Sequence, residues 1–259
     1  MESAIIAGTG IYQLPGFSFE QLVVETEYGQ AFINVGTKDG FELAFLARHG
    51  LDHSTPPHKI NFRANMKALQ MLGVKQILAT YAVGSINRDI PPASLTVLSD
   101  FLDFTSGRPL SFFEGGKSGL AHTAMDEPYC PSLSQRMQNL APEFGLDIHP
   151  GAVYVATNGP RFETPAEIRM YAKLGGDVVG MTGIPEVVLA RELNMHFAAV
   201  AYSINWAAGL EKNIEFVSSQ MEVTKQKLSS LLIRTLQGRI VMTCSCEKAV
   251  MFMHAPENV

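Results

Sequence analysis

Short apolar runs alternate with longer amphipathic segments along most of the chain. Runs with the length and composition of strands lie at residues 4–7, 41–47, 74–81, 95–98, 152–156, 177–180 and 197–204. Between them, apolar positions recur at helical spacing over residues 59–72, 133–140 and 218–237. Strands that alternate with helices predict an α/β fold, a single domain in which helices flank a mixed central β-sheet.

The sequence between residues 157 and 186 predicts two more helix starts. Thr164 and Glu167 have the spacing of a capping box, with Pro165 at the first helical position, so a helix should begin there. A second helix should begin at Pro185, after a short buried strand. The loops around these helix starts are therefore expected where elements meet, which is where α/β proteins place their sites.

Nothing in the sequence divides the chain into separate units, since no linker, repeat or low-complexity segment appears. Residues 1–240 are expected to form one domain, and residues 241–259 an irregular C-terminal tail. Residues 104–128 are rich in Gly, Ser and aromatic residues and lack periodicity, so they read as a long loop. A loop of this length is usually functional or covered by a partner.

Composition narrows the possible partners. The chain has 259 residues, 46% of them hydrophobic, and a formal net charge of -5 with no basic cluster. This charge argues against nucleic acid or an anionic membrane as a partner, so any bound phosphate must be held locally. The N-terminus has no basic segment and only a short apolar run, so a cytoplasmic location is expected.

The three cysteines predict no disulfide framework and no metal centre. Cys130 is far from Cys244 and Cys246 in sequence, and no partner pair of Cys or His at zinc-ligand spacing lies near any of them. The Cys244-Ser245-Cys246 segment is read either as a redox-active pair or, preferably, as two incidental thiols. Neither a metal nor an organic cofactor is expected.

Polar groups suited to an oxyanion follow several of the predicted strands. Gly8-Thr9-Gly10 forms a turn whose backbone N–H groups can face one point. Arg48 offers a fixed, forked charge for phosphate, and His49 a second donor. Each feature also has a plain alternative, because a turn often merely ends a strand, and an Arg-His pair can be a surface charge beside a cap.

Taken together, these loops and two longer motifs resemble a known family. The motifs are Asn158-Gly159-Pro160-Arg161-Phe162-Glu163-Thr164 and Val187-Val188-Leu189-Ala190-Arg191. The pattern is similar to the trimeric purine nucleoside phosphorylases and methylthioadenosine phosphorylases, from about Ile5 to Leu236. The resemblance implies phosphorolysis, in which phosphate attacks the anomeric carbon of a purine nucleoside and releases the base and a pentose 1-phosphate. Inorganic phosphate is then a co-substrate.

The resemblance also implies roles for residues around phosphate and sugar. Phosphate would be held by Thr9, Arg48, His49, the backbone N–H of Ala82 and the hydroxyl of Thr182. Met181 would pack against the ribose and Phe162 against the purine, although both also suit ordinary core packing. Tyr81 departs from the methylthioadenosine phosphorylases, which have a threonine there that contacts phosphate and ribose.

Two positions bear on the identity of the base. Glu163 stands where the purine nucleoside phosphorylases have a glutamate and the methylthioadenosine phosphorylases a serine. Asn205 and Ala207 stand where the latter have an Asp-x-Asp pattern. By this resemblance, Asn205, Glu163 and His49 are the catalytic candidates, and the base is a 6-oxopurine. A site built for one hydrogen-bonding pattern can reject the other by roughly 10⁴ or more.

The 5′ end of the sugar is the least determined part of the substrate. Residues 206–240 contain no histidine to meet a 5′-hydroxyl, whereas Val217 and Met221 suit an apolar pocket, or else the core. His122 matches the segment through which a neighbouring subunit closes the site, which implies a homotrimer. S-methyl-5′-thioinosine is therefore the preferred substrate. Inosine or guanosine, then methylthioadenosine, are the alternatives, with a hydrolase or a nucleoside-binding regulatory protein as rival classes.

Overall fold

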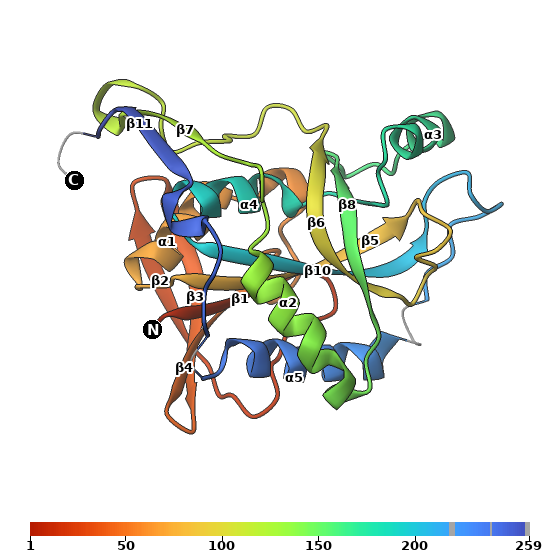
Figure 1. The fold of residues 1–259 in the computed structure, drawn as a ribbon, viewed down its shortest axis with the longest axis horizontal. Helices are drawn as coiled ribbons and strands as arrows, with labels where there is room; N and C mark the ends of the chain where they lie inside the picture. Colours follow the sequence, from red (N-terminus) through yellow and green to blue (C-terminus); the bar gives the residue numbers. More distant parts are fainter. Residues whose placement is uncertain (218–220, 239, 257–259) are drawn as a thin grey trace.

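A nine-stranded mixed sheet organises the chain (Figure 1). The computed structural model describes residues 1–217, 221–238 and 240–256. The strand order is β10-β6-β8-β9-β5-β1-β4-β3-β2, and β7 and β11 form a separate two-stranded sheet. The strands are β1 (Ser3–Ala7), β2 (Glu20–Thr26), β3 (Gly29–Lys38), β4 (Phe41–Ala47), β5 (Gln76–Ser85), β6 (Leu95–Asp103), β7 (Leu120–Thr123), β8 (Ile148–Ala156), β9 (Val178–Gly180), β10 (His196–Trp206) and β11 (Val250–His254). The α-helices are α1 (Phe62–Met71), α2 (Pro131–Leu140), α3 (Pro165–Lys173), α4 (Gly183–Glu192) and α5 (Glu222–Leu236).

Part of the sheet closes on itself. Strand β10 pairs in parallel with β5 and antiparallel with β6, so that β5, β10, β6, β8 and β9 form a ring. Near the end of β5, Gly84 lies opposite Asn205 of β10 and opposite Val179 of β9. Three strands therefore meet at Gly84, which is one of the residues that line the cavity described below.

Helices cover both faces of the central strands, and β1, which is buried along its whole length, shows this. Ala4 and Ile6 pack in the hydrophobic cluster that includes α1 and α4, whereas Ile5 and Ala7 pack in the cluster that includes α2 and α5. Figure 1 shows the two helix pairs on opposite sides of the central strands. Since successive side chains of a strand point to opposite faces, a continuous apolar run is what a doubly covered strand requires.

The predicted fold class is confirmed, as are the predicted strands and helices in their central parts. The capping box is present: the Glu167 N–H donates to the Thr164 hydroxyl at 3.2 Å, and the Thr164 N–H donates to the Glu167 carboxylate at 2.7 Å. The helix start predicted near Ser218 lies outside the described residues, and α5 begins at Glu222 within them.

The structure corrects two expectations and adds one hairpin that the sequence did not predict. The β2–β3 hairpin was missed, because the edge strand β2 is largely exposed and gives little hydrophobic contrast. The loop at residues 104–128 contains β7, and the supposedly irregular tail contains β11. These two strands pair with each other across a long sequence separation. The local sequence of either segment therefore does not predict that it forms a strand.

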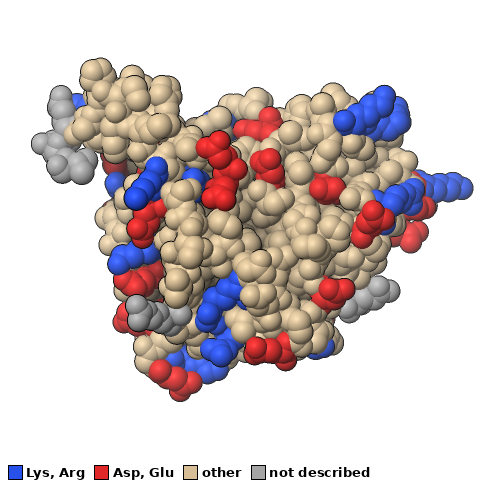
Figure 2. All heavy atoms as spheres, viewed as in Figure 1, with Lys and Arg blue, Asp and Glu red and all other residues tan. Residues whose placement is uncertain are grey.

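The distribution of surface charge and the length of the helices are relevant to nucleic acid and membranes as possible partners. On the face drawn in Figure 2, Lys and Arg side chains are interspersed with Asp and Glu among much uncharged surface. None of the described helices combines the length and the apolar character needed to cross a membrane.

Candidate active site

Most of the predicted site residues line one cavity of about 520 Å³. The lining includes the predicted phosphate ligands Thr9, Arg48, His49, Ala82 and Thr182. It also includes the predicted sugar and base contacts Phe162, Glu163, Met181, Asn205 and Ala207. Strands β1, β4, β5 and β10 run parallel, and their carboxyl ends meet at this edge of the sheet.

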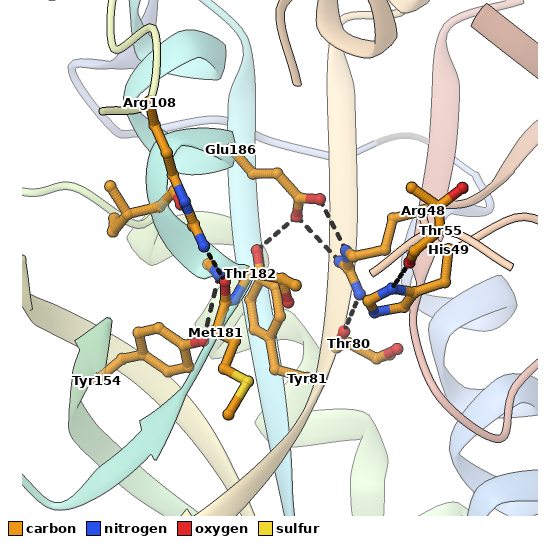
Figure 3. Close-up of polar contacts among 12 residues, drawn as sticks. Arg48, His49, Thr55, Thr80, Tyr81, Arg108, Tyr154, Met181, Thr182 and Glu186 are labelled. Carbon is orange, nitrogen blue, oxygen red and sulfur yellow. Dashed lines mark hydrogen bonds and ion pairs between the residues drawn. The ribbon is translucent and has the colours of Figure 1, made fainter. Parts of the chain in front are cut away.

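Arg48 is held in place by a buried carboxylate. Its Nε and Nη2 donate to the two oxygens of Glu186 at 2.7 and 2.9 Å, and Nη1 donates to the Thr80 carbonyl at 2.8 Å (Figure 3). Burial disfavours the charged guanidinium, but Glu186 more than offsets this, so the pKa of Arg48 is raised. A guanidinium has five N–H bonds, so those not used here, on the two terminal nitrogens, can meet an anion.

Gly8 leaves the room that Arg48 occupies. A Cβ atom at Gly8 would lie 2.6 Å from Nη1 of Arg48. A side chain at Gly8, after β1, would therefore clash with the guanidinium of Arg48, after β4, so the position of Arg48 depends on a glycine here.

Tyr81 does not line the cavity. Its hydroxyl donates to Glu186 at 2.8 Å, and the Arg48 guanidinium carbon lies 4.7 Å from the centre of its ring. The residue that departs from the family pattern therefore supports the Arg48–Glu186 pair from behind.

His49 accepts rather than donates toward the cavity. Its Nδ1 lies 2.8 Å from the Thr55 carbonyl, and because a carbonyl only accepts, Nδ1 carries the proton. Burial, chiefly, lowers the pKa of His49. In the favoured neutral form Nε2 is then an acceptor, which corrects the expectation of a second donor.

Thr182 sits on a loop fixed by Tyr154. The backbone N–H groups of Thr182 and Gly183 both donate to the Tyr154 hydroxyl at 3.2 Å (Figure 3). The Thr182 side chain makes no cap to α4, although it occupies the N-cap position. Its hydroxyl is therefore left for a ligand in the cavity.

Arg108, from the long loop, was missed by sequence reasoning. Its guanidinium donates to the carbonyls of Met181 at 2.8 Å, Asn158 at 3.1 Å and Thr157 at 3.4 Å, and also to that of Ile184. It thereby ties together the two loops that carry the predicted base and ribose contacts. No motif marks it, because these hydrogen bonds go to backbone groups of remote segments.

The two predicted base contacts are buried and oriented by neighbours. Glu163 accepts a hydrogen bond from the Thr157 hydroxyl at 2.7 Å. Asn205 follows a register shift in β10 and donates from Nδ2 to the Trp206 carbonyl at 2.7 Å. This bond uses one of the two Nδ2 hydrogens, so the other remains available to a ligand.

Three predicted residues do not line the cavity of this single chain. Met221 is fully buried in the cluster between α2 and α5. Val217 packs against the same cluster, although its N–H donates to Ile204, which does line the cavity. His122 is exposed on β7.

Comparisons with known proteins agree on one family. The profile of the Phosphorylase superfamily matches residues 2–237. A probable 6-oxopurine nucleoside phosphorylase of Moorella thermoacetica is 46% identical, over 92% of this chain and 93% of that protein. A probable S-methyl-5′-thioinosine phosphorylase of Methanopyrus kandleri is 42% identical, over 96% and 97%. A solved methylthioadenosine phosphorylase from an antarctic soil metagenomic library is 28% identical, with a TM-score of 0.84 over 96% of this chain and 90% of that one.

Proposed function

This chain belongs to the phosphorylase superfamily, and from that membership we propose that it cleaves the N-glycosidic bond of 6-oxopurine nucleosides with inorganic phosphate. The products are the free base and a pentose 1-phosphate. The observation that carries the proposal is that the residues lining one cavity include both Glu163 and Asn205 and a set of strand-end groups suited to an oxyanion. The proposal also includes a cytoplasmic location for the protein.

In the proposed mechanism, phosphate is positioned by hydrogen bonds from several strand ends. Arg48 offers its unused terminal N–H groups, Thr182 its hydroxyl and Ala82 its backbone N–H. Neutral His49 accepts a hydrogen bond at Nε2 from the remaining P–OH group of the phosphate dianion. Fixed donors of this kind act by positioning the nucleophile and by electrostatic stabilisation.

The departing base is met by Glu163 and Asn205. A hypoxanthine or guanine base has an N1–H that the Glu163 carboxylate accepts, and Asn205 donates its second Nδ2 hydrogen to N7. Negative charge builds on the purine as the glycosidic bond breaks, so the Asn205 hydrogen bond strengthens in the transition state. Adenine has no N1–H, which leaves Glu163 buried without a donor from the base and favours 6-oxopurines.

For the 5′ substituent, an apolar group is proposed. The cavity wall contributed by the segment after β10 is made of Ala207, Ala208 and Ile214. These residues offer no hydrogen bond to a 5′-hydroxyl from their side chains, so S-methyl-5′-thioinosine is preferred over inosine or guanosine. The name of the Methanopyrus kandleri relative agrees with this choice, and that of the Moorella thermoacetica relative with the alternative.

A homotrimer is part of the proposal. Met251, Phe252 and Met253 of β11 are about half exposed, beside the strand that carries His122. Apolar strand surface of this kind suits burial against a second copy of the chain, which would bring His122 to the neighbour's cavity. Light scattering should give the mass of a trimer, and a fully active monomer would refute this part.

Initial rates on four nucleosides test the function. Methylthioinosine, inosine, guanosine and methylthioadenosine are each supplied with and without phosphate. We expect fast, phosphate-dependent release of hypoxanthine from methylthioinosine. Equal or faster cleavage of inosine or guanosine would refute the apolar 5′ site, and a preference for methylthioadenosine would refute the roles of Glu163 and Asn205. Cleavage without phosphate would make the protein a hydrolase, and tight nucleoside binding without products a regulatory protein.

A further inference from the structure

Four side chains of the kind that bind metal ions meet outside the candidate active site. The ligand atoms of Cys130, His196, Cys244 and Cys246 all lie within 4.8 Å of one another. Cys130 precedes α2, His196 begins β10, and the other two cysteines lie in the C-terminal segment around the 3₁₀ turn η5 (Cys246–Lys248). Figure 1 shows this blue segment passing beside the start of β10. The cavity described above includes none of the four.

The distances within this cluster are those of a tetrahedral ligand set. Zn–S bonds of about 2.3 Å and Zn–N bonds of about 2.0 Å place the ligand atoms of a tetrahedral zinc site roughly 3.5–3.8 Å apart. Here the Cys130 and Cys244 sulfurs are 3.5 Å apart, and His196 Nδ1 lies 3.7 Å from the first sulfur and 3.2 Å from the second. A disulfide would need about 2.05 Å between two sulfurs. Small adjustments would therefore place all four atoms around one ion.

The backbone that carries the ligands is also fixed. The Cys130 N–H donates to the Phe197 carbonyl at 2.7 Å, and the His196 N–H to the Lys75 carbonyl at 2.8 Å. Cys130 and Cys246 are fully buried, and His196 is 5% exposed. A buried, closed set of four ligands is the form of a structural metal site rather than a catalytic one.

Groups outside the cluster suit a metal-bound state. Nε2 of His196 lies 3.5 Å from a carboxylate oxygen of Glu247. A metal-ligating histidine commonly donates its other ring N–H to such a carboxylate, which fixes the tautomer that leaves Nδ1 free to bind the ion. Three thiolates and one Zn²⁺ carry one excess negative charge, and a buried cation lies nearby to balance it.

That cation is Arg191, which is 2% exposed. Its Nε and Nη1 find no hydrogen-bond partner in the part of the chain that the structure describes. The positive charge of Arg191 acts on the Cys246 thiol, so Arg191 lies within electrostatic reach of the cluster. A thiolate-rich metal complex would give this otherwise poorly compensated guanidinium its counter-charge.

We propose that Cys130, His196, Cys244 and Cys246 bind one zinc ion as a structural site that fastens the C-terminal segment to the body of the protein. Thiolate and imidazole ligands in tetrahedral arrangement select zinc among the common divalent ions. The fastened segment continues into β11, which pairs with β7. The ion therefore also supports the strand that carries His122, independently of the proposed reaction.

Metal analysis of the full chain tests the site. Protein purified with zinc in the medium should contain about one zinc ion per chain, and Co²⁺ exchanged into the site should give the intense visible bands of tetrahedral thiolate coordination. Cys244→Ser and Cys246→Ser should each remove the bound zinc. Ser245→Ala is the matched control, because Ser245 is exposed between the two ligands, and it should keep the full content. Glu247→Gln should weaken zinc affinity by roughly 10-fold or more while keeping the stoichiometry.

The state of the thiols separates the alternatives. Titration of unfolded protein should find three free thiols once zinc is chelated, and stripping zinc from the folded protein should lower its Tm. Three free thiols in protein that takes up neither zinc nor Co²⁺ would overturn the proposal. Two thiols that appear only after reduction would overturn it in favour of a disulfide. Because these measurements use the wild-type chain, the test holds even where a variant fails to fold.

Discussion

Replacing Glu186 by Gln should separate the stability of the site from its chemistry. The carboxylate is 2% exposed and accepts three hydrogen bonds, from Arg48 at 2.7 and 2.9 Å and from Tyr81 at 2.8 Å. Gln keeps one oxygen acceptor, but its NH2 group replaces the other. That NH2 group would face an N–H of Arg48 or the O–H of Tyr81, so two donors would meet and a hydrogen bond would be lost. Arg48 would remain charged and buried without a counter-charge. Breaking a buried pair in this way costs about 3–5 kcal/mol of unfolding free energy.

In a chain of this size, that loss corresponds to a fall in Tm of roughly 6–20 °C. Phosphate should restore part of it, because the anion becomes the main counter-charge of Arg48. A ligand at 100 times its Kd adds about 2.7 kcal/mol of stability. The increase in Tm on adding phosphate should therefore be larger in Glu186→Gln than in the wild type, although kcat should fall because Arg48 is no longer oriented.

Thermal unfolding with and without phosphate measures both effects. Glu192→Gln is the matched control: Glu192 lies on the same helix and is nearly as buried, but its partners are Ser111 and the Phe112 N–H rather than a cation. That control should leave the phosphate response unchanged. A Tm of Glu186→Gln within about 2 °C of the wild type, or a phosphate response no larger than that of the control, would refute the reasoning.

Three further outcomes are expected. Asn205→Ala should lower kcat/KM on 6-oxopurine nucleosides by roughly 10² or more, through loss of a leaving-group hydrogen bond, and near-normal initial rates would contradict its role. Arg108→Met should lower kcat by roughly 10-fold or more with little change in the KM for phosphate, because the loops that carry Met181 and Asn158 lose their shared hydrogen-bond donor. Equal changes in kcat and KM would instead indicate that the substitution disturbs the whole site. Because burial lowers the pKa of His49 from 6.5, its acceptor form persists to more acidic pH. The measurement is the ratio of the wild-type rate to the His49→Asn rate as a function of pH, because the ionisation of phosphate affects both rates equally. This ratio should stay constant as pH falls through 6.5 and decline only below it. A decline centred above 6.5 would contradict the acceptor role of His49.

The features that the sequence predicted well are local ones. The capping box at Thr164 and Glu167 depends on residues three apart, and the strands of the doubly covered sheet are short apolar runs bounded by turns. Arg48 could be placed because it follows such a strand, and because parallel strands deliver their carboxyl ends to one edge. Asn205 and Glu163 were singled out only by the resemblance to a known family, since alone they read as a turn residue and a helix-start carboxylate.

The features that the sequence did not predict depend on remote partners. Glu186 is 138 residues from Arg48, and a glutamate near the start of a helix is unremarkable until the fold brings the two together. The hydrogen bonds of Arg108 go to backbone carbonyls, which no side-chain pattern records. The cysteine cluster draws its ligands from three separate segments, so the spacing rule for metal ligands, applied along the chain, could not find it.

The charge balance of the cavity suggests why Glu186 is useful to a phosphorylase. Arg48 is offset by a carboxylate and His49 is neutral, so phosphate would be held mainly by oriented hydrogen bonds rather than by net positive charge. A strongly cationic site would stabilise the free dianion most, and phosphate loses negative charge as it attacks the sugar. Binding that favours the ground state does not raise kcat. An oriented but nearly neutral Arg48–Glu186 pair positions the nucleophile without stabilising free phosphate too strongly. The Glu186→Gln variant should therefore bind phosphate more tightly than the wild type but turn over more slowly.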